Sequence, residues 1–166
     1  MTVNNYLQST TNPIVYSAGG AADSEGLPLT PIAVLEGHTV ASNIIKSNHK
    51  KINYPPMPTV VFTLPTMASV GYTEAEAKER NYNVRVNYKE VGGWFNAKRL
   101  NVEEYAFKTI IDEDTQTILG AHIIGPHTEE TINLFAIAIK TKMKVNDIRT
   151  MVFTYPTLAS DIPHML

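Results

Sequence analysis

The sequence predicts an α+β fold, in which helices cover an antiparallel sheet and a strand–turn–helix segment precedes the sheet. Two patterns favour this fold class. Residues 105–111 and 118–124 are apolar runs that flank the polar segment 112–116, which is typical of a β-hairpin. Residues 129–143 then carry apolar side chains at helical spacing. Strands joined by so short a turn pair in opposite directions, so we expect an antiparallel sheet.

The composition indicates a globular protein and excludes several classes of function. Of the 166 residues, 43% are hydrophobic and 18% are charged, which is enough for a packed core. The formal net charge of -2 does not favour binding to nucleic acid or to an anionic membrane surface. No apolar run approaches the roughly 20 residues of a membrane-spanning helix. We find no signal peptide and expect a cytoplasmic location.

The chain has no cysteine, and its five histidines do not stand at the spacings of metal ligands. Disulfides, thiolate metal sites and thiol chemistry are therefore excluded within these residues, and we predict no metal site. His122 lies inside an apolar run, so we interpret it as a hydrogen-bonded histidine of the core or of an interface.

The first fifty residues contain one short β-prone run and one long helix. Residues 14–18 form the β-prone run, which ends at Gly19 and Gly20. Thr30 is predicted as the N-cap of a helix that extends to about residue 47, with Pro31 at its first position. The polar, proline-bearing segment 48–58 is the best candidate for a domain boundary, and we divide the chain into residues 1–50 and 51–166.

The remaining elements follow from local signals. The spacing and turn residues predict strands at 59–63, 67–72 and 83–88. Between the last two of these strands, a helix begins at the capping box Thr73–Glu76 and extends to about Arg80. A last helix is predicted to be capped by Asn146 and Asp147 and to extend to about Met151. The segment Gly92–Phe95 leaves two interpretations open. It is either a loop whose rings fold over the core or a mobile loop at a partner or substrate surface.

Two stretches of the first fifty residues, Val15–Ala22 and Leu29–Ala33, resemble the second flavin-contacting stretch of the pyridine nucleotide-disulfide oxidoreductases. Residues 58–63, 68–74 and 118–125 are similar to the start, first turn and hairpin of the C-terminal dimerisation domain of that family. The family includes glutathione reductase, dihydrolipoamide dehydrogenase and mercuric reductase. The resemblance implies that residues 1–50 are the end of a Rossmann-type FAD domain.

The resemblance implies an FAD-dependent, homodimeric enzyme that passes electrons from NAD(P)H to a disulfide or a related acceptor. The family's GxGxxG flavin motif, redox cysteines and nicotinamide domain have no counterpart in these residues. We therefore expect a fragment of a longer parent protein that is inactive and binds neither FAD nor NAD(P)H by itself. The alternative is a stand-alone, non-catalytic dimerisation or interaction module. The acceptor, and the choice between NADH and NADPH, remain open.

The resemblance also implies a set of cofactor-binding positions: Gly19, Gly20, Leu29, Thr30, Pro31, Ala33 and Pro156. Members of the family usually carry an aspartate at the position of Gly20, where it holds a ribityl hydroxyl of FAD. This side-chain contact is absent here, and Asp23 is displaced along the loop. The helix N-terminus at Thr30 would stabilise negative charge on a reduced flavin, although the pattern alone is also that of an ordinary helix.

The C-terminal tail, TYPTLASDIPHML, contains the two catalytic candidates. The family usually ends in His-Pro-Thr-x-x-Glu, where the histidine serves as acid–base in the partner's active site and the glutamate orients it. Here Tyr155 stands at the histidine position, Ser160 at the glutamate position, and Asp161 one residue later. An unperturbed tyrosine has a pKa near 10, against about 6.5 for histidine, so it is a poor base at neutral pH. Either the substrate differs from that of the family, or Tyr155 acts as an acid or a gate, or it only packs on the flavin side.

Two further expectations concern packing. Residues 157–166 contain few apolar side chains, so we expect the tail to lie along the surface or against a partner. The helix at 129–143 is apolar on more than one side, with Ile132, Leu134, Phe135, Ile137 and Ile139. One face covers the sheet, and the rest predicts a homodimer.

Overall fold

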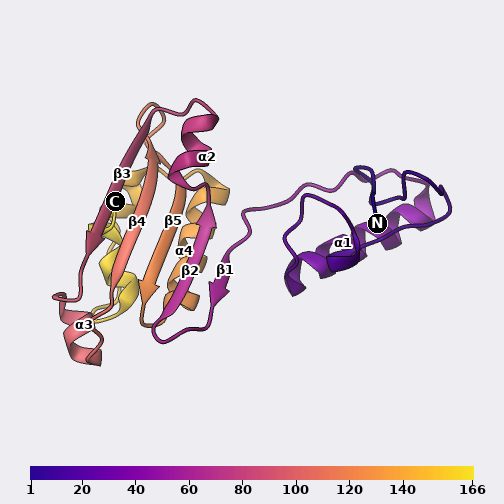
Figure 1. Cartoon of the computed structure of the whole chain (residues 1–166). Helices are drawn as coiled ribbons and strands as arrows, with labels where there is room; N and C mark the ends of the chain where they lie inside the picture. Colours follow the sequence, from indigo (N-terminus) through magenta and orange to yellow (C-terminus); the bar gives the residue numbers. More distant parts are fainter. The chain divides into compact units, whose positions relative to one another are not determined.

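A computed structural model describes all 166 residues, which form two compact units, Met1–Met57 and Pro58–Leu166 (Figure 1). The units divide after residue 57, seven residues beyond the division that we predicted. Residues 51–57 pack with the first unit, because the Ile52 N–H donates to the Asn5 carbonyl at 2.9 Å and the Tyr54 hydroxyl reaches Glu36. No helix of the chain is both long and apolar enough to cross a membrane.

The first unit contains a short 3-10 turn, η1 (Gly19–Ala21), and one long helix, α1 (Thr30–Lys46). The predicted strand at 14–18 is wrong. That run lies beside residues 7–9, where the Ser9 N–H donates to the Val15 carbonyl at 2.8 Å and the Ser17 N–H donates to the Leu7 carbonyl at 3.0 Å. The pairing amounts only to an isolated bridge between Tyr16 and Gln8 and does not extend into a strand. The predicted N-cap is also displaced by one residue, since Leu29 occupies the cap and Thr30 already has helical geometry.

Polar side chains hold the first unit together. The buried residues of α1 are Ile32, Glu36, Thr39 and Asn43, three of which are polar. The Asn43 carboxamide donates to the carbonyls of Tyr6 and Lys50 at 3.0 and 2.8 Å, and it accepts the Lys50 N–H. These bonds tie both chain segments that flank the helix to its buried face.

The second unit is built on a five-stranded sheet in which all neighbouring strands are antiparallel, as predicted. Its order is β1-β2-β5-β4-β3, from the strands β1 (Thr59–Val61), β2 (Thr66–Gly71), β3 (Val84–Glu90), β4 (Ala106–Asp112) and β5 (Thr117–Gly125). The predicted hairpin is therefore confirmed as β4–β5. The capping box at Thr73 and Glu76 is also confirmed, and it begins α2 (Glu74–Glu79).

Three more helices complete the unit: α3 (Phe95–Leu100), α4 (Thr128–Thr141) and α5 (Val145–Arg149). Helix α4 covers one face of the sheet and is the helix predicted at 129–143 (Figure 1). Asn146 and Asp147 do not cap α5, contrary to our prediction. The helix begins earlier, at Val145, because that side chain is buried and its N–H bonds to the Gln116 carbonyl at 2.9 Å.

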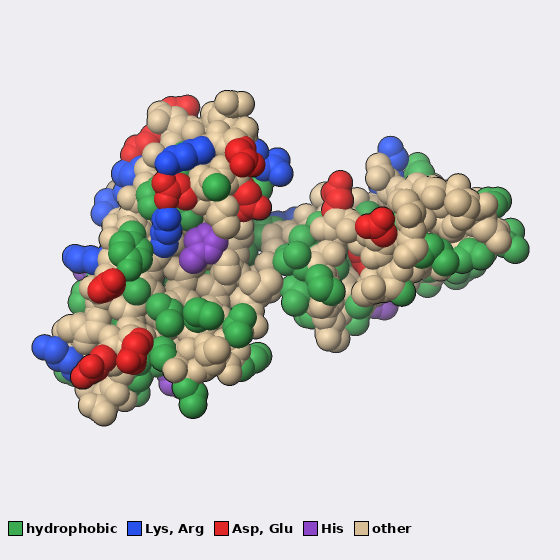
Figure 2. Space-filling view, in the orientation of Figure 1, with side chains coloured by type: hydrophobic (Ala, Val, Ile, Leu, Met, Phe, Trp, Pro, Cys, Tyr) green, Lys and Arg blue, Asp and Glu red, His purple; other side chains and the backbone are tan.

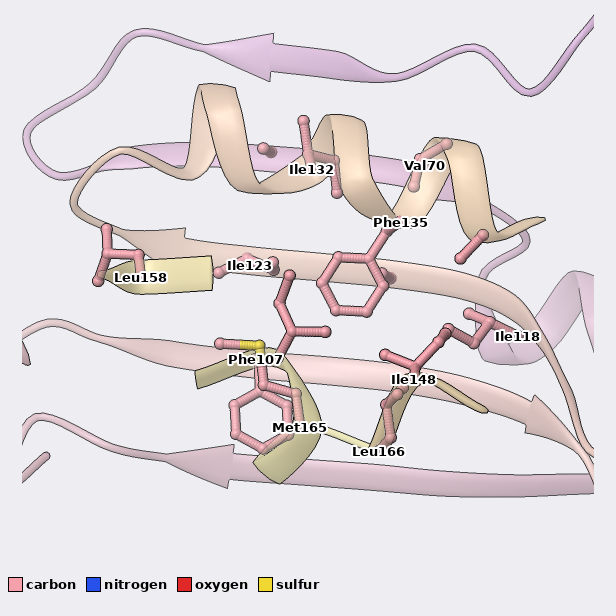
Figure 3. Packing of buried hydrophobic residues seen from close by; sticks show 14 of the residues in the cluster. Val70, Phe107, Ile118, Ile123, Ile132, Phe135, Ile148, Leu158, Met165 and Leu166 are labelled. Carbon is pink, nitrogen blue, oxygen red and sulfur yellow. The ribbon is translucent and has the colours of Figure 1, made fainter. Parts of the chain in front are cut away.

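The C-terminal tail corrects the expectation of a surface segment. It forms a 3-10 helix, η2 (Leu158–His164), and its few apolar side chains enter the core beside Ile132 and Phe135 of α4 (Figure 3). Those side chains are Leu158, Ile162, Met165 and Leu166, each at most 8% exposed. The tail is thus a core element, because nearly all of its apolar residues turn to the same side.

The other face of the sheet carries the alternate residues of each strand and is open. Figure 2 shows this face, where hydrophobic side chains gather on one part and charged side chains on another. His122 lies there, with Nδ1 at 2.6 Å from the Ser69 hydroxyl and Nε2 at 3.2 Å from the Tyr72 carbonyl. These bonds agree with our interpretation of His122 as a hydrogen-bonded histidine.

Candidate functional site

Tyr155 stands at the start of the tail with its side chain directed away from the core. It is 68% exposed, and the Tyr155–Pro156 peptide bond is cis. Its ring stacks on the ring of Phe95 in α3, with 5.9 Å between the centroids and 27° between the planes. No residue of the chain accepts or donates a hydrogen bond at the Tyr155 hydroxyl. The hydroxyl is therefore available to a group outside this chain.

Ser160, which stands at the position of the family's orienting glutamate, is a helix cap and not a partner of Tyr155. The Thr157 hydroxyl accepts the Ser160 N–H at 3.3 Å, and the Ser160 hydroxyl accepts the Thr157 N–H at 3.4 Å. This reciprocal pair begins η2. The two residues fix the direction in which the chain leaves Tyr155.

Asp161 lies in η2 and is buried, at 8% exposure, with both carboxylate oxygens occupied. Asn96 donates to Oδ1 at 3.0 Å, and the Tyr105 hydroxyl donates to Oδ2 at 3.2 Å. Burial raises the pKa of Asp161 above its ordinary value, and these two hydrogen bonds oppose the rise. Burial and the neighbouring Asp161 carboxylate raise the pKa of Tyr105 far above its ordinary range. The structure thus makes Asp161 a buried acceptor.

Trp94 agrees with the first interpretation of Gly92–Phe95, in which a ring folds over the core, while a mobile loop at a partner or substrate surface stays a prediction. Trp94 packs on the core, with its ring centroid 5.8 Å from that of Phe107 and 6.0 Å from that of Tyr105. Phe95 turns the other way, is 55% exposed, and meets Tyr155. Helix α3 was not predicted, because its six residues are too few to show a helical pattern.

A hollow of about 610 Å³ lies between α3 and the tail. Its lining residues are Lys89, Trp94, Phe95, Arg149, Asp161, Pro163 and His164. Neither Lys89 nor Arg149 forms a salt bridge within the chain. Arg149 instead donates to the main-chain oxygen of Leu166 at 2.6 Å. Aromatic surface and positive charge therefore lie beside the residue on which Tyr155 stacks.

In the first unit, the structure brings Gly19 and Ala33 of the predicted cofactor set into contact. Gly19 has a φ of 64°, and a Cβ on it would stand 3.0 Å from the Ala33 Cβ. Glycine is thus required there by both backbone conformation and packing. A Cβ on Gly20 would meet no atom within 4 Å, so this glycine presents bare backbone to open space.

The other cofactor candidates lie at the start of α1 and in the tail. Thr30 and Pro31 are exposed, Leu29 is half-buried, and the first turn of α1 has neither an acidic residue nor a side-chain cap. The N–H groups of this turn therefore have no side-chain partner. A helix N-terminus of this kind can stabilise negative charge, which is the property expected of a contact to a reduced flavin. Pro156 is exposed in the second unit, next to Tyr155.

Glu36 is a buried structural residue beside the glycine turn that the sequence patterns did not reveal. It is 1% exposed and accepts hydrogen bonds from the Gly19 N–H at 2.5 Å, the Ser24 hydroxyl at 2.7 Å and the Tyr54 hydroxyl at 2.5 Å. Burial, followed by the hydrogen bond to Glu36, raises the pKa of Tyr54. Glu36 therefore holds the glycine turn against α1. Its position one helical turn after Ile32, on the buried face, was the available signal.

Comparison with known proteins identifies the class of this fold. Residues 57–166 match the dimerisation domain of the pyridine nucleotide-disulphide oxidoreductases, and the chain therefore belongs to that family. The resemblance seen in the sequence is thereby confirmed. The chain is 32% identical to a mercuric reductase from Bacillus cereus over 160 residues, which are 96% of this chain and 25% of the reductase.

A relative of similar length also exists. The chain is 52% identical, over 164 residues, to an uncharacterized 19.7 kDa protein in a mercuric resistance operon of Staphylococcus aureus, covering 99% of this chain and 91% of that protein. Among solved structures, a Cu(II) complex of the HOCl-induced flavoprotein disulfide reductase RclA from Escherichia coli has the same fold. It matches with a TM-score of 0.85 and 23% identity, over 98% of this chain and 37% of that chain.

Proposed function

We propose that this chain forms a homodimer through the outward face of α4 and presents Tyr155 to the active site of the partner subunit. The enzyme to which this domain contributes is an FAD-dependent NAD(P)H oxidoreductase of the cytoplasm that reduces a disulfide or a related acceptor. Membership of the dimerisation domain family supports the first part of the proposal. The exposed Tyr155 hydroxyl, which has no partner in its own chain, supports the second.

The outward face of α4 is the observation that carries the proposal. On the inner face, Ile132, Phe135 and Ala138 are buried against the sheet. On the outer face, Leu134 is 39% exposed and Ile137 is 56% exposed, near the middle of the helix. Apolar side chains in the centre of an exposed helix face favour burial against another protein surface.

The charges that flank this apolar centre suit a two-fold contact. Glu130 lies on the same face toward the N-terminus of the helix, and Lys140 lies toward its C-terminus. Neither forms a salt bridge within the chain. When two copies of α4 pack antiparallel about a two-fold axis, Glu130 of one copy comes near Lys140 of the other. The face is therefore complementary to itself in charge as well as in hydrophobicity.

Reversing these charges tests the proposed interface. We expect Glu130→Lys and Lys140→Glu each to weaken the dimer, because each single change places like charges opposite one another. The double variant Glu130→Lys with Lys140→Glu restores opposite charges and should restore the dimer. Sedimentation velocity over a concentration series at low salt measures the association of all three. A monomeric wild-type chain at tens of micromolar, or equal dimerisation of all variants, would contradict the proposal.

The first unit supplies the residues that would contact FAD in such an enzyme. The uncapped N-terminus of α1, at Leu29, Thr30 and Pro31, and the glycine turn packed on Ala33 fit the edge of a flavin. When bound, FAD supplies the electron transfer between NAD(P)H and the acceptor. The chain itself offers backbone donors at this edge and a hydroxyl at Tyr155.

We predict that the chain, expressed as these 166 residues, is colourless and does not oxidise NADH or NADPH. It lacks both the GxGxxG phosphate-binding loop and the thiols that the family uses. Absorbance at flavin wavelengths and NAD(P)H consumption check this directly. A yellow preparation that retains FAD through gel filtration would contradict it.

A second candidate function is a stand-alone, non-catalytic dimerisation module. It is favoured by one observation, the 19.7 kDa relative of which this chain covers 91%. The reading frame around the gene distinguishes the two functions. Two Gly-rich βαβ units and a cysteine pair encoded in frame upstream would support the enzyme, whereas a native start at Met1 would support the module.

A further inference from the structure

Tyr155 has little in its own contacts to hold it in one orientation. Its side chain is 68% exposed, its hydroxyl makes no hydrogen bond within the chain, and its only aromatic neighbour is Phe95. An exposed ring held by one stacking contact samples several rotamers unless the backbone on both sides of that contact is fixed. The residues that fix this backbone therefore determine where the hydroxyl points.

Asn96 makes that connection. It follows Phe95 in α3, is 1% exposed, and donates from Nδ2 to the Thr157 carbonyl and to Asp161 Oδ1, both at 3.0 Å. One carboxamide thus links the helix that carries Phe95 to two points of the tail just after Tyr155. No other side-chain hydrogen bond joins α3 to the tail.

The orientation of the Asn96 carboxamide is determined by these partners. A rotation by 180° would place Oδ1 against two oxygens that cannot donate, the Thr157 carbonyl and the Asp161 carboxylate. In the orientation observed, Asn96 Oδ1 is buried and has no hydrogen-bond partner. A buried acceptor without a partner destabilises a fold, so the contribution of Asn96 lies in the two bonds that it donates.

Asp161 completes the link on the other side. Its second oxygen accepts from Tyr105, which is 2% exposed and immediately precedes β4. The series Phe95–Asn96–Asp161–Tyr105 therefore ties the stacking partner of Tyr155 to the sheet. Both oxygens of Asp161 accept hydrogen bonds within the domain, so Asp161 makes no direct contact with the Tyr155 hydroxyl. It influences the position of Tyr155 only through Asn96 and Phe95.

From this geometry we infer that Asn96 is the positioning residue of Tyr155: its two hydrogen bonds lock α3 to the tail and so hold the Tyr155 ring on Phe95. The inference rests on the proposed function only in giving Tyr155 a role in a partner's site. The packing that it describes exists within one chain and can be measured there.

The test is Asn96→Asp, which keeps the shape of the side chain but replaces the Nδ2 group that donates to Thr157 and Asp161 by a carboxyl oxygen. We expect loss of the nuclear Overhauser contacts between the rings of Phe95 and Tyr155, and averaging of the Tyr155 ring signals. The fluorescence of Trp94, the only tryptophan, reports whether the adjoining core is intact. Asn96→Leu, which removes the donors without adding charge, is the second variant and should give the same loss.

Two matched controls separate positioning from general disruption. Asp161→Asn keeps an acceptor for Asn96 and should retain the ring contacts, and Asn146→Asp changes an exposed asparagine of α5 that makes no side-chain bond. Ring contacts that persist in folded Asn96→Asp or Asn96→Leu would overturn the inference. Sedimentation of the same samples reports dimerisation separately, so failure of the proposed function is distinguished from failure of the positioning role.

Discussion

Replacing Glu36 by alanine is expected to unfold the first unit while the second unit stays folded. The change removes the acceptor of the Gly19 N–H and of the Ser24 and Tyr54 hydroxyls, which converge on one buried carboxylate. A donor left without a partner away from water costs about 1–3 kcal/mol, and three half-buried donors lose their partner here, so we expect a loss of about 3–5 kcal/mol from this unit.

The two units provide separate probes for this experiment. Trp94 lies in the second unit, so its fluorescence follows that unit alone, whereas amide exchange of α1 follows the first. We expect faster exchange in α1 and an unchanged Trp94 transition. Glu25→Ala, an exposed acid of the same unit, is the matched control and should change neither probe. Equal protection of α1 in Glu36→Ala and in the wild type would show that the carboxylate does not hold the turn.

The second large effect is expected at Tyr155. In the flavoprotein that contains this domain, Tyr155→Phe should lower acceptor turnover by about 10²–10⁴-fold if the hydroxyl donates a proton in the reaction. Reduction of the flavin by NAD(P)H should continue, because that half of the cycle does not use the tail. Stability should change by less than about 0.5 kcal/mol, since the ring is exposed and its hydroxyl is unbonded within the chain.

Stopped-flow measurement of the two half-reactions, together with thermal unfolding, checks each part of this result. Tyr88→Phe is a suitable control, because Tyr88 is 60% exposed and its hydroxyl bonds only to Glu90 of the same strand. Full acceptor turnover in Tyr155→Phe would assign Tyr155 a packing role. A fall in the flavin half-reaction as well would point to a disturbed cofactor site instead.

Local patterns in the sequence were sufficient for the elements whose signals are local. The β4–β5 hairpin follows from two apolar runs around a polar turn, and α4 follows from its helical spacing. The capping box at Thr73 and Glu76 is a reciprocal pair of bonds within four residues, so it is visible without any tertiary contact. The antiparallel sheet follows from these elements because short connections leave few ways to pair the strands.

The cofactor and tail candidates were located by resemblance, and the structure alone describes their surroundings. The sequence contains Asp161 and Asn96 but does not reveal that they meet, since they lie 65 positions apart. Glu36 and Gly19 are likewise 17 positions apart. Hydrogen bonds between distant residues leave no periodic signal along the chain. An acidic residue that is buried by such bonds is therefore predicted from sequence to be exposed.

The C-terminal tail shows most clearly what the sequence determines and what only the tertiary structure determines. From sequence alone, Tyr155 is identified as the residue that replaces the family's histidine, and the low basicity of tyrosine follows from its chemistry. Only the tertiary structure decides that Met165 and Leu166 are buried, with the Met165 carbonyl held by Asn87 at 3.0 Å and Thr109 at 2.6 Å. The physical reason is that burial depends on whether the sheet and α4 leave a space that fits these side chains. Such a space is created by strands far away in the sequence, so the apolar residues of the tail alone do not show that it exists.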